Sequence, residues 1–219
     1  MTLPALTIDI VSDVVCPWCV IGSRNLATAI EEVRDEIQVD TTWKPFELHP
    51  HIAPEGAERK SFTQQKFGDV DAARSRYAQI AEMGKEVGFT FNFGKCPVVP
   101  NTFQAHRLMW YAEQQGCQDE ISERLFVAFF VDGRNVGDID ELIKIGIEQG
   151  LEAEALEAFM RGDEAAKLTR DELTHYREEG IYGVPTFIVN GKYQITGGQT
   201  PETFAAWLRK LAAKEASAV

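Results

Sequence analysis

The sequence has no long hydrophobic run, only four cysteines, and far fewer basic than acidic residues. Its 22 Lys and Arg stand against 34 Asp and Glu, which gives a formal net charge of −12. Proteins that bind nucleic acid need a basic surface, so this balance argues against nucleic acid as a partner. It argues equally against an anionic membrane surface. An acidic excess by itself indicates only that solvated helix faces carry Asp and Glu.

The missing hydrophobic run also argues against a membrane-spanning protein. Residues 1–15 contain no basic segment and no small-residue cleavage site, so we expect no signal peptide and a cytoplasmic location. Four cysteines are too few for a disulfide scaffold in a chain of 219 residues. Disulfides in a reducing compartment are mostly transient and catalytic.

The first part of the chain predicts a strand, a helix and a second strand. Residues 6–15 are rich in β-branched side chains and partly alternate in hydrophobicity, which is typical of a strand. From Cys16 the apolar positions follow a helical period. Residues 37–50 predict another strand that ends in a proline-containing turn. This order is typical of the opening of a parallel sheet.

The middle of the chain, from about residue 59 to 180, predicts only helices. Glycines such as Gly116 and Gly162 follow the helical segments, as expected of helix C-termini. Asn101 and Asp138 stand where N-caps are expected. The segments differ in length and pattern, so the sequence does not indicate a helical repeat.

Strands return near the C-terminus, at residues 185–189 and 193–196. The Asn190-Gly191 pair between them favours the type I′ turn of a tight hairpin. A closing helix is predicted with Thr200 as its N-cap and Pro201 at its first position. We therefore expect an α/β sheet domain formed by residues 1–58 and 176–219, interrupted by a helical insertion over residues 59–175.

Cys16 and Cys19 form a CxxC pair at the predicted junction of strand and helix. Unpaired N–H groups and the positive end of the helix dipole at this point stabilise a thiolate, which predicts a nucleophilic Cys16. Cys19 is one turn further along on the same side, where it can resolve a mixed disulfide. Pro17 suits the first helical turn and stiffens the pair.

Three other interpretations of the pair remain open. A structural zinc site needs four ligands, and Cys96 and Cys117 lack the usual ligand spacing. A purely structural Cys16–Cys19 disulfide would close a very small loop with little entropic benefit. The third alternative is that the two cysteines are inert buried thiols. The redox pair is the interpretation that we favour.

Four segments together resemble a known family: "SDVVCPWCVIG", "KPFELHP", "NTFQAHRL" and "GVPTFIVNGKYQITGGQ". A strand that leads into CPWC, a distant GVPTF hairpin and a final helix are similar to the thioredoxin superfamily. The helices between the second and third strands resemble its DsbA branch, and the full set of motifs resembles the FrnE-type subfamily. The resemblance implies an α/β, thioredoxin-like fold with a large all-helical insertion between the second and third strands.

The resemblance also implies roles for individual residues. Cys16 would attack the substrate, as the more exposed thiol, and Cys19 would resolve the mixed disulfide. Pro185 would be cis and would pack against the pair, keeping metals out. The backbone of Val184 would pair with an extended substrate. His106, in the NTFQAHRL segment, either faces the active site or makes an ordinary hydrogen bond between helices.

Two positions depart from the family pattern. Many thioredoxin-like proteins have a buried acid six residues before the nucleophile, and Ile10 occupies that position here. Asp13 is a candidate substitute in proton transfer. Strongly oxidising members have Pro-His between the cysteines, whereas this chain has Pro17 and Trp18. Tryptophan cannot favour a thiolate electrostatically as histidine can, so the resemblance does not imply a strong oxidant.

The function expected from the pair is thiol–disulfide exchange with a thiol or disulfide substrate, either a protein or a small molecule. No metal or organic cofactor is expected, although glutathione is a candidate reductant or co-substrate. The alternatives are a glutathione-dependent isomerase or transferase, of the kappa or 2-hydroxychromene-2-carboxylate isomerase type, and a non-catalytic peptide-binding module. Relatives of the isomerase type typically have serine at the position of Cys16.

A few further residues have weaker patterns. Cys96 and Cys117 bracket a predicted helix that holds them too far apart for a disulfide, so we expect buried free thiols. His49 and His51 form an HxH pair, which is weak evidence for a metal. His175 is expected at the surface. Phe91 and Phe93 are expected in the core, with the wall of a substrate groove as the alternative.

Overall fold

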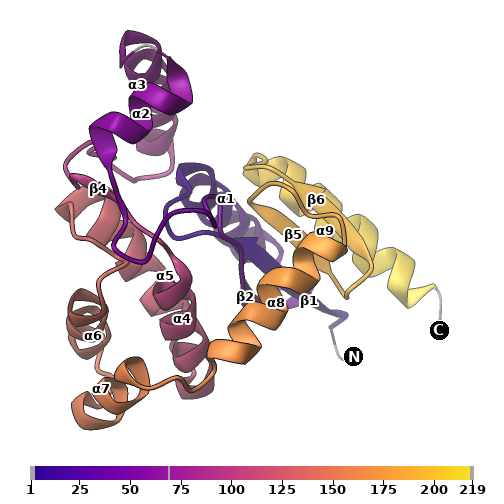
Figure 1. The fold of residues 1–219 in the computed structure, drawn as a ribbon. Coiled ribbons are helices and arrows are strands. Elements are labelled where there is room, and N and C mark those ends of the chain that lie inside the picture. Colours follow the sequence, from indigo (N-terminus) through magenta and orange to yellow (C-terminus); the bar gives the residue numbers. More distant parts are fainter. Residues whose placement is uncertain (1–2, 69, 218–219) are drawn as a thin grey trace.

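A four-stranded mixed sheet forms the centre of one part of the molecule (Figure 1). The structure is a computed structural model that describes residues 3–68 and 70–217. The strand order is β2–β1–β5–β6, with β1 parallel to β2 and the other neighbours antiparallel. The strands are β1 (Ala5–Ser12), β2 (Gln38–Pro45), β5 (Thr186–Val189) and β6 (Tyr193–Thr196).

Helices cover both faces of this sheet. On one face, α1 (Pro17–Val33) and α9 (Pro201–Ala216) pack on alternate side chains of β1, including Leu6, Ile8 and Ile10. Alternate residues of a strand point to opposite faces, so Val11 points the other way. There it packs against Tyr176 of α8 (Ala166–Glu178), the helix that crosses the sheet in Figure 1.

The insertion lies between β2 and β5, and all of its helices except α8 form the left-hand part of Figure 1. It contains, in chain order, β3 (Ala57–Glu58), α2 (Arg59–Phe67), α3 (Val70–Glu86), β4 (Val98–Val99), α4 (Phe103–Gln115), α5 (Gln118–Val127), a π-helical turn η1 (Ala128–Asp132), α6 (Ile139–Glu148), α7 (Ala153–Arg161) and α8. The expected α/β fold with a helical insertion between the second and third strands of the sheet is confirmed. Within the insertion, β3 and β4 add a short antiparallel pair. The boundary expected at 175/176 falls inside α8.

Some boundaries differ from the sequence-based predictions. The second strand ends at Pro45 instead of residue 50, because the following segment turns so that the Leu48 amide donates to the buried Asp13 carboxylate. Thr102, not Asn101, is the N-cap of α4, although the Asn101 side chain accepts from the Phe103 amide. Asp138 is the N-cap of α6, as predicted.

The predicted caps and turns near the C-terminus are confirmed. Asn190 and Gly191 have positive φ values of 50° and 63°, as a type I′ turn requires. The Thr200 hydroxyl accepts from the Thr203 amide at the start of α9. Gly162 was expected to take the left-handed conformation of a C-cap, but its φ is −84°.

The insertion contacts the sheet domain at the edge strand β2. The amide of Gln118 at the start of α5 pairs with the backbone of Trp43, accepting from its N–H at 2.8 Å and donating to its C=O at 3.1 Å. This side chain therefore forms the hydrogen bonds that a neighbouring strand would form, and it covers part of an otherwise open sheet edge. Cys16 and three residues of the first turns of α1, Cys19, Val20 and Ile21, are buried in the same core as the helices of the insertion. The CxxC pair thus lies where the two parts meet.

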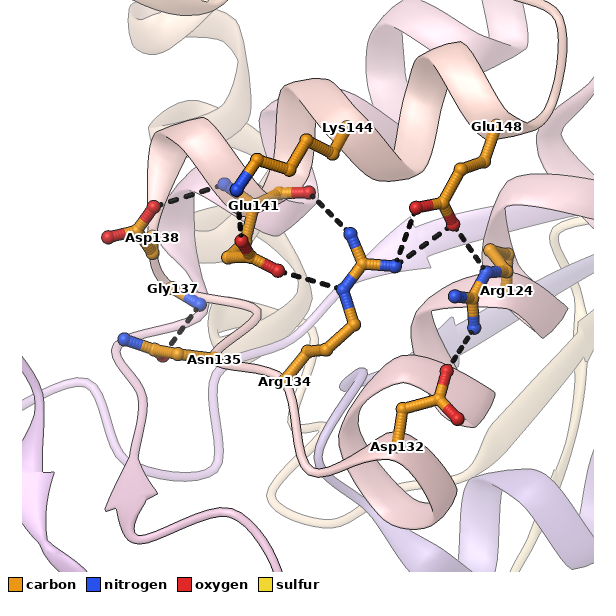
Figure 2. Close-up of polar contacts among 9 residues, drawn as sticks. All are labelled: Arg124, Asp132, Arg134, Asn135, Gly137, Asp138, Glu141, Lys144 and Glu148. Atoms are coloured by element: carbon orange, nitrogen blue, oxygen red, sulfur yellow. Dashed lines mark hydrogen bonds and ion pairs between the residues drawn. The ribbon is translucent and has the colours of Figure 1, made fainter.

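An ion-pair network joins α5, η1 and α6 on the surface of the insertion (Figure 2). Arg134 donates to Glu141 at 2.8 Å and to both oxygens of Glu148 at 2.9 Å. Arg124 contacts the same Glu148 at 2.9 Å and Asp132 at 2.7 Å. Shared carboxylates make such a network more stabilising than isolated surface pairs. Among residues 3–68 and 70–217, no helix combines the length and the apolar character needed to span a membrane.

Candidate active site

Cys16 stands at the N-cap position of α1, at the junction predicted from the sequence. Its backbone is extended, with φ −94° and ψ 111°, and Pro17 follows at the first helical position. The Cys16 amide donates to the Asp13 carbonyl at 2.9 Å, which closes the turn that joins β1 to α1. The thiol is therefore held beside the free N–H groups of the first helical turn, where a negative charge is favoured.

Cys19 lies below Cys16 in the interior and is 0% exposed, compared with 2% for Cys16. Burial raises the pKa of the Cys19 thiol well above its usual range, and the neighbouring Cys16 sulfur raises it further. Hydrogen bonds from the Ser12 side chain and the Asp13 backbone oppose this effect. Cys19 is therefore a protonated thiol near neutral pH. All four cysteines of the chain are free thiols in the structure.

The segment before β5 approaches Cys16 from the other side. The Val184–Pro185 peptide bond is cis, as the family resemblance implies. The Cys16 Sγ atom is 3.6 Å from the Val184 carbonyl oxygen. Gly22 on α1 allows this approach, since a Cβ atom there would lie only 3.0 Å from Cγ of Pro185. The sequence-predicted residues Cys16, Val184 and Pro185 thus come together.

Asp13 and His106 also come together, although 93 positions separate them in the sequence. Asp13 is 0% exposed, and its carboxylate accepts from the Leu48 amide at 2.7 Å. His106 Nε2 lies 3.7 Å from Asp13 Oδ1 and 2.9 Å from the Phe46 carbonyl oxygen. Because a carbonyl only accepts, Nε2 carries a proton in this arrangement. Ile10 is buried on the apolar face that packs against α1 and α9, so the acid lies elsewhere than in the common family pattern.

A cavity of about 510 Å³ opens directly over Cys16. Its near side is formed by the active-site edge of the sheet domain, including Trp18, Leu48 and Val184. Its far side comes from the insertion, mainly α2, α3 and η1. The cavity reaches Cys16 but not Cys19, so only the first cysteine of the pair is open to a ligand.

Two side chains in this cavity were not predicted as site residues. His49 Nε2 lies 3.5 Å from Lys66 Nζ, and both line the cavity together with Cys16. Burial and then the Lys66 charge lower the pKa of His49 to about 4, so His49 is neutral near neutral pH. Burial lowers the pKa of Lys66, and the charge of a Cys16 thiolate raises it. A cation and a neutral imidazole thus lie near the thiol.

Residues 7–209 of the chain match the model of the family described as DSBA-like thioredoxin domain. The chain belongs to the DsbA-like thioredoxin family. It is 30% identical over 198 residues to the uncharacterized protein YwbO of Bacillus subtilis, a match that covers 90% of this chain and 92% of YwbO. The structure is also similar to a probable DsbA oxidoreductase of Streptomyces coelicolor, with 25% identity and a TM-score of 0.85 over 96% of this chain and 91% of the other.

Two solved structures of lower sequence identity share the fold. The cytosolic disulfide reductase DsbM of Pseudomonas aeruginosa with GSH has 22% identity and a TM-score of 0.65, covering 94% of this chain and 98% of DsbM. A 2-hydroxychromene-2-carboxylate isomerase has 15% identity and a TM-score of 0.69, covering 97% of this chain and 99% of the isomerase. At these identities the comparison shows the DsbA-like fold alone.

One signal in the sequence indicates where His49 lies. Parallel strands end at the same edge of a sheet, and Ser12 at the end of β1 pairs with Pro45 at the end of β2. The segment after β2 therefore meets the segment that leads to Cys16, and His49 lies in it. Lys66 comes from α2 in the insertion, and nothing in its local sequence indicates this position.

Of the remaining candidates, only Phe93 lines the cavity over Cys16. Cys96 is buried, and its thiol contacts the Val98 carbonyl at 3.3 Å. Cys117 was expected to be buried but is only half-buried, because it stands at the N-cap position of α5. Phe93 lines the cavity over Cys16, and Phe91 lies buried behind it with parallel rings 4.9 Å apart.

The other histidines do not form a metal cluster within the part of the chain that the structure describes. The rings of His49 and His51 are 6.0 Å apart, and no group of three or more His, Cys, Asp or Glu side chains in that part is placed to bind a metal ion. His175 is exposed on α8, as predicted.

Proposed function

We propose that this protein is a thiol–disulfide oxidoreductase that uses Cys16 and Cys19 as a redox pair. The observation that carries the proposal is the asymmetry of the two thiols. Cys16 stands at a helix N-terminus on the floor of an open cavity, whereas Cys19 is fully buried beneath it with a raised pKa. This asymmetry supports Cys16 as the attacking thiol and Cys19 as the resolving thiol.

The reaction proceeds in two exchanges. The Cys16 thiolate attacks one sulfur of a substrate disulfide, forms a mixed disulfide and releases the first substrate thiolate, which takes up a proton. Cys19 then loses its proton and attacks Cys16 Sγ, which releases the second thiolate. The substrate disulfide is reduced to two thiols, and the protein pair is oxidised to a disulfide; the reverse sequence oxidises a dithiol substrate.

Neighbouring residues assist both steps in this proposal. Lys66 brings a positive charge into the cavity that Cys16 lines, whereas Trp18 brings none. The buried Asp13 carboxylate is the candidate acceptor for the proton that Cys19 releases, and the Leu48 amide holds that carboxylate in place by a hydrogen bond of 2.7 Å. The backbone of Val184, beside the cis Pro185, contacts the bound substrate.

The pair needs no metal or organic cofactor in this mechanism, because the electrons move between sulfur atoms. We propose a cytoplasmic location and glutathione as the thiol that returns the pair to its reduced form. The support is the fold shared with the cytosolic disulfide reductase DsbM, whose structure contains GSH. A FrnE-type assignment within the family rests on the four sequence motifs.

The test is to trap the mixed disulfide. Cys19→Ser should accumulate a covalent adduct at Cys16 when mixed with a disulfide such as oxidised glutathione, detected by intact-mass spectrometry. Cys16→Ser should form no adduct at this site, and Cys117→Ser serves as a matched control that keeps the pair. Absence of an adduct in a folded Cys19→Ser protein overturns the mechanism. An isomerase of the glutathione-dependent type would instead retain its activity in Cys16→Ser.

A further inference from the structure

The cavity over Cys16 differs from an open peptide groove. Cys16 is only 2% exposed and lies on the cavity floor, with α2 and α3 of the insertion on the opposite side. A volume of about 510 Å³ lies within the range of pockets that enclose small organic ligands. A cavity of this size, with helices of the insertion on one side, matches a small molecule better than a segment of a folded protein.

Aromatic rings line much of this cavity. They are those of Trp18, Phe62, Tyr77, Phe93, Phe129 and Phe130. Tyr77 and Phe93 stack with ring centroids 4.6 Å apart and planes within 19° of each other. Such walls favour a flat apolar ligand, because stacking and edge contacts add to the burial of its surface.

Among the described residues, the charged side chains that line the cavity are all basic, in contrast to the acidic excess of the whole sequence. Arg59, Lys66 and Arg76 reach the cavity, and its lining includes neither Asp nor Glu among the described residues, although the chain carries −12 overall. Arg59 donates to the carbonyl oxygens of Cys96 and Val98, neither of which neutralises its charge. The guanidinium also lies 5.2 Å from the ring centre of Phe129, so cation and aromatic wall are adjacent. This combination favours an anionic group on an apolar body.

We propose that the substrate of the Cys16–Cys19 pair is a small organic disulfide with a flat apolar body and a carboxylate that pairs with Arg59. This inference rests on the proposed function. Cys16 forms a bond to one sulfur of the substrate while the substrate S–S bond breaks, and Cys19 then displaces the second half. One substrate disulfide and two protein thiols become two substrate thiols and one protein disulfide, and an external thiol such as glutathione reduces the pair again.

The first experiment compares three disulfides under single-turnover conditions with the reduced protein. The probes are 5,5′-dithiobis(2-nitrobenzoate), which is aromatic and anionic, 4,4′-dithiodipyridine, which is aromatic and uncharged, and bis(2-hydroxyethyl) disulfide, which is aliphatic and uncharged. Each rate is divided by that of the same probe with 2-mercaptoethanol, which removes differences in intrinsic reactivity. We expect the anionic aromatic probe to have the highest normalised rate, about tenfold above the uncharged aromatic one, as for one charged contact.

Variants connect this preference to the cavity. Arg59→Gln should lower the anionic-to-uncharged rate ratio about tenfold, whereas Arg59→Lys should retain most of it. The ratio is insensitive to a general loss of folded protein, which would lower both rates together. Arg161→Gln removes an exposed arginine on α7, outside the cavity lining, and should leave the ratio unchanged. A ratio that is equal for wild type and Arg59→Gln overturns the proposal.

A second experiment measures binding without redox chemistry. Calorimetry should show that 2-naphthoate binds the Cys16→Ser/Cys19→Ser double variant about tenfold more tightly than uncharged 2-naphthamide. If naphthoate has no advantage, the cavity does not select carboxylates and the inference is wrong, even if disulfides still oxidise the pair. If naphthoate binds as expected but no disulfide oxidises the wild-type pair, the proposed oxidoreductase function is wrong and the anion site stands.

Discussion

Arg107 offers a direct test of how the insertion is held together. This side chain of α4 is 2% exposed. Its guanidinium donates to the backbone carbonyls of Phe159, Met160, Gly162 and Glu164, at distances from 2.8 to 3.3 Å. It thus donates to carbonyl groups in the last turn of α7 and in the loop that leads to α8. Carbonyl groups at a helix C-terminus have no N–H donor within the helix.

The expected cost of Arg107→Met follows from these bonds. The bonds to Phe159 and Met160 are buried, and each carbonyl left without a donor there costs about 1–3 kcal/mol. Gly162 and Glu164 are partly exposed, so water replaces the lost donors at little cost. Methionine retains most of the apolar stem. We therefore expect a loss of about 4 kcal/mol in the free energy of unfolding, within a total of about 5–15 kcal/mol for a domain.

The assay is urea unfolding followed by circular dichroism, with Arg161→Met as the matched control. Arg161 is half exposed and forms ion pairs with Asp140 and Glu157, so its replacement should cost less than about 1 kcal/mol. Arg107→Lys should lose most of the stability as well, because one ammonium cannot reach carbonyls on several sides. Equal losses in Arg107→Met and Arg161→Met would refute the reasoning, and full stability in Arg107→Lys would show that only the charge matters.

Two further predictions concern pH. Hydrogen bonds from Lys144 and Arg134 hold the pKa of Glu141 below its usual range, so this network stabilises the protein at neutral pH and loses its effect as the carboxylate is protonated (Figure 2). Arg134→Met should therefore cost about 1 kcal/mol near neutral pH, and a difference in urea midpoint that persists below about pH 3 would contradict this. For His49, burial and Lys66 lower the pKa from 6.5 to about 4, so the unfolded chain takes up the proton first and stability falls between those values. His49→Gln should lose less stability than wild type over that interval in the same assay, and parallel curves would show that His49 does not titrate there.

Much of the redox pair's surroundings could be predicted from the sequence because the signals are local. The change from strand to helical period at Cys16 places that residue at a helix start, and the structure has the same junction. The Asn190-Gly191 turn and the Thr200 cap also depend on neighbouring residues alone. Backbone preferences of this kind act over a few residues, so they can be recognised without the fold.

Elements whose ends depend on distant contacts were predicted less well. The β-rich pattern of the second strand runs into the following segment and predicts a strand that continues to residue 50. In the structure that segment leaves the sheet at Pro45 and wraps around the buried Asp13 carboxylate. Local backbone preferences do not indicate such a contact, since its partner Asp13 lies in the turn after β1, 35 positions from Leu48.

The sequence by itself determined the CxxC pair, its position at a helix start and the order of sheet domain and insertion. Only the tertiary structure decided what surrounds the reactive thiol. Three residues of the cavity lining come from distant segments. His49 follows the end of β2, and Arg59 and Lys66 lie on α2 of the insertion. These side chains meet Cys16 because distant segments pack against one shared core, and side-chain packing between segments leaves no periodic pattern in the sequence. The position of the pair is thus encoded locally, whereas the cavity over Cys16 is a product of packing.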